Sequence, residues 1–161
     1  MAAGLSSAID RICAIIENCD PSTNWGRSHQ RLSTLLGKET IPSGIDKKYF
    51  IHMRIRDERP VVTGSHVTTI NKIELELARY YGGGELHSSE YYGLSKQLES
   101  QADIVEQCLL YSNNWDSVNT GIWLIYMDGS EQTSQKLGSN IMLRVLDFTV
   151  TIRQPKTFVQ V

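Results

Sequence analysis

The segment from Lys48 to Tyr80 constrains the fold most, because it reads as two amphipathic strands joined into a hairpin. Each arm alternates apolar and charged residues, and the apolar positions are Ile51, Met53 and Ile55 in the first arm and Ile73, Leu75 and Leu77 in the second. Side chains two residues apart share one face of a strand, so each arm has an apolar face and a charged face. The link from Asp57 to Ser65 is too long for a tight turn, and we expect it to project as a loop or a ribbon tip.

Two helices are predicted on either side of this hairpin. The first spans Ser6–Cys19, and its apolar stripe consists of Leu5, Ile9, Ile12, Ile16 and Cys19. The second lies between Ser88 and Tyr111, and its apolar face consists of Tyr91, Leu94, Leu98, Ala102, Val105, Cys108 and Leu109. The triple glycine Gly82–Gly84 separates the hairpin from the second helix and is interpreted as a flexible connection.

A second hairpin is predicted to close the chain. Gly121–Met127 is apolar on both faces, which favours a central strand or one covered on both sides. Asp128–Ser139 reads as a polar loop. Asn140–Arg153 alternates again and predicts a long strand that ends before Pro155.

These elements predict an α+β fold in the order α-β-β-α-β-β. Two hairpins make a mostly antiparallel sheet of about four strands, with the two main helices packed on one face. The length of 161 residues suits one domain over 1–161, with an irregular arm over about 20–47 and the hairpin over about 48–80. Loops as long as this arm are uncommon within a compact domain and are often binding elements.

Composition narrows the classes of function. The formal charge of −2 is unlike that of a dedicated nucleic-acid-binding protein, although a local basic patch remains compatible with it. Residues 1–80 hold eleven of the sixteen basic side chains and nine of the eighteen acids, so the first half is mildly basic and the second acidic. The three cysteines are interpreted as buried free thiols. We expect no signal peptide and no membrane span.

No catalytic, cofactor or metal motif is found in the sequence. The four histidines are scattered, and none forms HExxH or a Cys/His pair at zinc spacing. A cysteine–histidine pair that meets only in space stays open, but helix-buried thiols are poor nucleophiles. We therefore expect a protein that is not an enzyme and holds no metal or cofactor.

Seven residues are candidates for an interface. Trp25 and Arg27 lie in the irregular arm, and aromatic side chains with arginine are typical interface anchors; the alternative for Trp25 is that it covers the edge of the core. The densest basic run consists of Lys47, Lys48, Arg54, Arg56 and Arg59. This run could bind nucleic acid with the neighbouring rings, contact another subunit, or simply be the solvated face of the hairpin.

The plan of the whole chain resembles the tail terminator proteins of long-tailed, non-contractile bacteriophages, most of all those of T-five-like siphophages. The resembling features are the helix Leu5–Cys19, the arm Trp25–Lys47, the charged hairpin Ile51–Leu77, the helix before Tyr111 and the closing strand Leu143–Arg153. The resemblance covers essentially all 161 residues but includes no short motif, so no residue role is carried over.

The resemblance implies a structural virion protein that forms a homohexameric ring. Such a ring caps the tail tube, stops its polymerisation and offers a docking surface to the head-completion or connector protein, while DNA passes through the lumen without specific binding. It implies a place in the virion tail after assembly in the host cytoplasm, with no cofactor and no membrane partner. The alternatives are another virion joint protein, such as a head-completion protein or tail-tube subunit, and a nucleic-acid-binding module that uses the basic hairpin.

Overall fold

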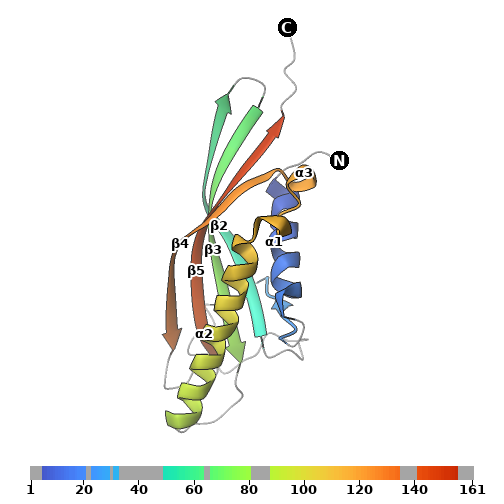
Figure 1. The fold of residues 1–161 in the computed structure, drawn as a ribbon. Coiled ribbons are helices and arrows are strands. Elements are labelled where there is room, and N and C mark those ends of the chain that lie inside the picture. The colour runs from blue at the N-terminus through green and yellow to red at the C-terminus, as the bar shows by residue number, and fades with distance from the viewer. Residues whose placement is uncertain are drawn as a thin grey trace.

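The structure, a computed structural model, is an α+β fold built on one sheet. It describes residues 5–20, 23–29, 31–32, 49–63, 66–80, 88–134 and 141–155. The five strands lie in the order β1-β2-β3-β5-β4. Helices α1 (Leu5–Cys19) and α2 (Ser88–Leu110) lie on one face of the sheet, as Figure 1 shows. We call the opposite surface, which carries Glu74 and Glu76, the outer face.

Three long strands form the centre of the sheet. β2 (Tyr49–Thr63) and β3 (His66–Tyr80) form the predicted hairpin, and β5 (Ile141–Pro155) pairs antiparallel with β3 along its full length, from Tyr80↔Ile141 to His66↔Pro155. The side chains of these strands alternate between the two faces of the sheet, as the sequence predicted. Ile73, Leu75 and Leu77 of β3 are buried in the main core beneath the helices, and the charged residues between them point to the outer face.

The hairpin link is shorter than the sequence suggested. We expected a loop or a projecting tip from Asp57 to Ser65, whereas β2 and β3 stay paired out to Thr63↔His66. β-branched residues such as Val61 and Val67 follow the charged stretch and favour extended backbone. Pro60 does not stop the strand, because within the described residues β1 reaches only the start of β2 and leaves Pro60 on the edge of the sheet.

The strand count and order of the sheet differ from the prediction of four strands in the order α-β-β-α-β-β. A fifth strand, β1 (Gly26–Arg27), pairs parallel with β2 through Gly26↔Phe50 and Arg27↔Ile51, so the sheet is mixed. Two short helical turns, η2 (Ser112–Asn114) and α3 (Ser117–Thr120), also follow α2. A strand of two residues has no alternation to detect, which is why the arm read as irregular.

The position of β4 (Ile122–Ser134) also corrects a prediction. The apolar run Gly121–Met127 was expected in a central or doubly covered strand, but β4 is the last strand of the sheet and pairs only with β5 among the described residues. Ile122 and Ile125 are buried beneath the helices, whereas Trp123, Leu124 and Tyr126 are exposed. Part of the expected polar loop Asp128–Ser139 belongs to this strand, because β5 offers partners as far as Met142; residues 135–140 lie outside the described part.

Both main helices bury most of the apolar faces expected of them, with a shift in the first. In α2, Leu94 and Cys108 are half-buried, and the side chain of Tyr91 lies outside the described part. Leu98, Ala102, Val105 and Leu109 of α2 are buried. In α1, Ile12 and Ile16 are buried as predicted, but Ala8, Cys13 and Ile15 join them and Ile9 is only half-buried. The arm also contributes to the packing of the sheet. Its Leu32 joins a smaller hydrophobic cluster on the outer face, together with Phe50, Ala78, Ile141 and Leu143. Residues 33–48, which include the rest of the arm, lie outside the described residues.

The sheet has three register shifts, one in β2 and two in β4. One of those in β4, between Ile122 and Leu124, lies at the start of the strand, and the other two shifts lie beside the same row of residues. In β2 the register shifts between Ile55 and Asp57, and in β4 it shifts between Met127 and Gly129. Bulges increase the local twist of a sheet, and Figure 1 shows the strands turning strongly at mid-length. Both shifts also separate like charges. Asp57 now lies opposite Lys72 in place of Arg56, and Gly129 lies opposite Asp147 in place of Asp128.

The core assignment predicts which side chains carry stability. Phe148 is fully buried at the centre of β5. Phe148→Ala should lower the free energy of unfolding by about 3–5 kcal/mol, because it removes a ring and leaves a cavity. Urea unfolding followed by circular dichroism measures this. Val118→Ala, at a side chain that is 92% exposed, is the control and should change the value by less than about 0.5 kcal/mol. Equal effects of the two changes would contradict this packing.

Candidate interaction surface

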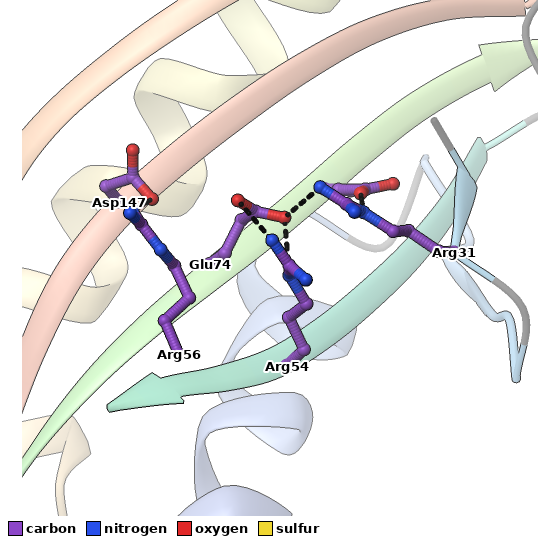
Figure 2. Close-up of polar contacts among 6 residues, drawn as sticks. Arg31, Arg54, Arg56, Glu74 and Asp147 are labelled. Atoms are coloured by element: carbon purple, nitrogen blue, oxygen red, sulfur yellow. Dashed lines mark hydrogen bonds and ion pairs between the residues drawn. The ribbon is translucent and has the colours of Figure 1, made fainter. Parts of the chain in front are cut away.

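The outer face of the sheet carries a network of arginine and carboxylate side chains, shown in Figure 2. Glu74 and Glu76 point there from β3, and both are buried, at 8% and 1% exposure. Arg54 of β2 binds Glu74 through two hydrogen bonds, Nε to Oε1 at 2.8 Å and Nη2 to Oε2 at 3.2 Å. Arg31 reaches both acids, with Nε donating to Oε1 of Glu76 at 3.0 Å and Nη2 to Oε1 of Glu74 at 3.3 Å.

The remaining arginines on the charged side of β2 are paired as well. Arg56 Nη1 donates to Asp147 Oδ1 on β5 at 2.8 Å, so this contact crosses β3. Arg59 Nε donates to Asp57 Oδ2 at 2.8 Å within β2 itself. Each of the three arginines of β2 thus has a carboxylate partner. The basic run seen in the sequence is therefore electrically matched in the folded chain.

The pKa of Glu74 reflects this environment. Burial raises the pKa of the carboxyl, but the hydrogen-bonded ion pair with Arg54 and the nearby charges of Arg31 and Arg56 lower it more, so the pKa lies below its ordinary value. The same contact raises the pKa of the Arg54 guanidinium. Glu74 is therefore ionised at neutral pH, and its charge holds the arm and both hairpin strands together.

A second region of the outer face is apolar and exposed. Trp123, Leu124 and Tyr126 lie at the sheet edge in β4, with 63%, 45% and 43% of their surfaces exposed. The Arg153 guanidinium lies 5.1 Å from the centroid of the Trp123 ring, a cation–π contact. Exposed aromatic side chains beside an arginine are typical of protein–protein contacts. We call these three residues of β4 the edge patch.

The seven predicted interface residues separate in the structure. Trp25 is 3% exposed and packs edge-on against Tyr49 with ring centroids 5.2 Å apart. It therefore covers the edge of the core, which was the alternative to a role as an interface anchor. Arg27 forms an ion pair with Glu17 of α1. Lys47 and Lys48 lie outside the described residues. The other three, Arg54, Arg56 and Arg59, lie on β2 and form the ion pairs given above.

Sequence reasoning missed the edge patch and most of the acidic partners of the network. The apolar run of β4 was visible, but only the edge position of the strand leaves Trp123 and Tyr126 uncovered. The pairing of Arg54 with Glu74 follows from the hairpin register, which places them opposite each other. Arg31 and Asp147 come from distant parts of the chain, and no local signal in the sequence links them to β2.

The histidines, cysteines and acids of the described residues do not gather into a metal-binding set. Within them, no group of three or more histidine, cysteine or acidic side chains could hold a metal ion. Burial raises the pKa of Cys19 to about 11, with smaller contributions from Cys108 and Asp20, and burial also raises the pKa of Cys13. Both thiols stay protonated at neutral pH and are weak nucleophiles. His52 Nδ1 lies 2.9 Å from the Ser28 carbonyl oxygen, a bond that joins β2 to the arm.

Helices long and apolar enough to cross a membrane do not occur in the described part of the chain. Compared with models of known protein families and with curated protein sequences, the chain matches none.

The ionised state of Glu74 predicts a pH-dependent contribution to stability. Glu74→Gln keeps the size of the side chain but removes the charge that Arg54 and Arg31 contact, and should lower the free energy of unfolding at about pH 7 by about 1–3 kcal/mol. Because the folded pKa is lowered, the stabilising effect is present above the ordinary value of 4.5 and is lost as the pH falls through the folded pKa. Urea unfolding over a pH series measures the difference between wild type and variant.

Asp103→Asn is the matched control, because it also replaces one carboxylate by an amide but lies exposed on α2. It should leave stability nearly unchanged across the series. A difference between wild type and Glu74→Gln that stays constant or grows towards acid pH would contradict the role given to Glu74.

Proposed function

We propose that this protein is a structural subunit of a bacteriophage tail that acts as the tail terminator. In this role identical copies form a hexameric ring that caps the tail tube, stops its polymerisation and gives the head connector a docking surface. The observation that carries the proposal is the edge patch, because three large apolar side chains exposed together at the rim of a sheet are suited to contact with another protein.

The charge balance of the outer face supports the same role. The arginines of β2 are matched by Glu74, Asp147 and Asp57, which makes this face a poor phosphate-binding surface. A protein that neutralises many phosphates holds DNA tightly at low salt. A nearly balanced subunit suits a lumen through which DNA passes without being held. The same pairing weighs against the alternative of a nucleic-acid-binding module built on the hairpin.

The resemblance of the chain plan to tail terminators supplies the partners. The proposed partners are further copies of the chain, the tail tube protein and the head-completion or connector protein, in the virion tail after assembly in the host cytoplasm. The proposal involves no cofactor and no membrane. The mildly basic first half and acidic second half of the sequence suit head-to-tail contact between copies, in which two different surfaces meet.

Mass measurement and imaging with purified tail tubes test this function. We expect rings of the full chain, either in solution or at the ends of added tubes, and tubes that no longer elongate once capped. Light scattering gives the mass, and negative-stain images show the tube ends. A protein that stays monomeric and does not bind tube ends would contradict the proposal. Long tubes formed by the chain alone would instead identify a tube subunit, and binding only to empty heads would identify a head-completion protein.

A further inference from the structure

Both long edges of the sheet offer unpaired backbone. Among the described residues, β1 covers only the start of β2, and the last backbone hydrogen bond on that side runs from Ser28 N to Ile51 O at 2.8 Å. From Met53 onward, β2 has no strand neighbour on the side away from β3 among the described residues. We call Met53–Val61 the β2 edge. On the other side of the sheet, β4 has a described neighbour only in β5. Such edges are templates for pairing with another chain.

The two edges differ in character. Both edge strands contain bulges, but the β2 edge also carries Pro60 and a dense run of charged residues, features that discourage uncontrolled pairing. β4 contains no proline, lysine or arginine, and the edge patch makes its start apolar. A long, exposed and apolar edge strand is expected to be covered in the assembled state. A ring subunit needs two such unlike surfaces, because head-to-tail contact joins one surface to a different one.

We propose that β4 of one copy pairs antiparallel with the β2 edge of a second copy, so that the two sheets become one continuous sheet. This inference depends on the proposed function, since the contact is the one that would close the ring. Its occupant is another copy of this chain, and the edge patch of one copy would lie beside the charged outer face of β2 in the next.

The strand directions fix the antiparallel sense. β2 runs opposite to β3, β3 opposite to β5, and β5 opposite to β4, so β2 and β4 run in opposite directions within one copy. Rotation about a ring axis roughly along the strands preserves both the direction of each strand and the side on which the outer face lies. The β2 edge of the second copy then runs antiparallel to β4 of the first, with both outer faces on the same side of the joined sheet.

Charge and side-chain chemistry favour this pairing over β4 with β4. Between Met53 and Val61, β2 carries three arginines and two acids, a formal charge of +1 (3 − 2). β4 carries Asp128 and Glu131 with no basic residue, a formal charge of −2. Two copies of β4 would bring these acids together, whereas β2 brings arginines that can stack on the exposed rings of the edge patch.

Cysteine cross-linking between separately prepared variants tests the contact. Tyr126→Cys is mixed with Arg56→Cys, Arg59→Cys or Val61→Cys, all on the outer face, under conditions in which the protein assembles. A bis-maleimide of about 8 Å spans offsets of roughly two residues along the strands, so the three positions cover the whole β2 edge. At least one mixture should give a covalent dimer that mass spectrometry assigns to a β4–β2 peptide pair.

Three controls show whether a cross-link reports the β4–β2 contact. Val118→Cys, at an exposed position of α3, should not react with the β2 variants. Wild-type protein gives the background of the native thiols, of which Cys13 is buried and Cys19 is protonated at neutral pH. Cross-linking of Tyr126→Cys to itself alone would mean that β4 pairs with β4, which would overturn the inference.

The mass of the same samples separates this inference from the proposed function. Rings that form without any β4–β2 cross-link would overturn the edge pairing and leave the terminator role standing. Failure to assemble even with tail tubes present would overturn both. A β4–β2 cross-link within assembled rings is the result that the inference expects.

A matched pair of substitutions tests the edge patch itself. Trp123 and Tyr92 are both 63% exposed, and each ring has a cation above it, Arg153 at 5.1 Å and Lys96 at 5.3 Å from the centroid. Trp123→Ser should weaken association at least about tenfold, as expected for an aromatic anchor at an interface. Tyr92→Ser, on α2, should leave it unchanged. Sedimentation across a concentration series measures both, and equal effects of the two changes would overturn the assignment of the patch.

Discussion

The two-sided character of β3 is the constraint on which the rest of the structure depends. Its apolar side chains, Ile73, Leu75 and Leu77, lie in the core beneath α1 and α2, so the intervening Glu74 and Glu76 must point to the other face. Both acids are buried there, between the neighbouring strands and the arm. A buried carboxylate without a partner is costly, so the fold requires arginines beside them. Arg54 and Arg31 supply these partners from β2 and from the arm.

This requirement changes how the basic residues of the hairpin are understood. In the sequence they resemble a surface for phosphate, but in the folded chain they act first as counter-ions for carboxylates on β3 and β5. Among the described residues, the large apolar side chains that stay exposed on the outer face are concentrated in β4. The counter-ions of β3 and the edge patch lie on different strands of one sheet, so the edge patch can change without removing a counter-ion from the core.

The sequence predicted the elements with strong periodicity and failed where burial depends on position in the sheet. Residue alternation located β2, β3 and β5, and helical spacing located α1 and α2 to within a few residues. The two-residue strand β1 has no period to recognise. The apolar run of β4 is equally compatible with a central strand and with an edge strand that carries exposed rings, and only the strand order separates the two. The Arg56–Asp147 pair depends on contacts between residues far apart in the chain, which a local pattern does not contain.

The bulge in β2 changes the phase of the alternation along this strand, so its distal half is held in a different register from its start. Before the bulge the odd-numbered residues Met53 and Ile55 face the helices, and after it the odd-numbered Asp57 and Arg59 face outward. Deleting Arg56 would remove the extra residue and leave the distal side chains on their present faces, whereas a one-residue deletion beyond the bulge would turn the side chains that follow it to the opposite surface. Among diverging versions of this chain, substitutions in the distal hairpin should therefore be far more common than insertions or deletions of a single residue.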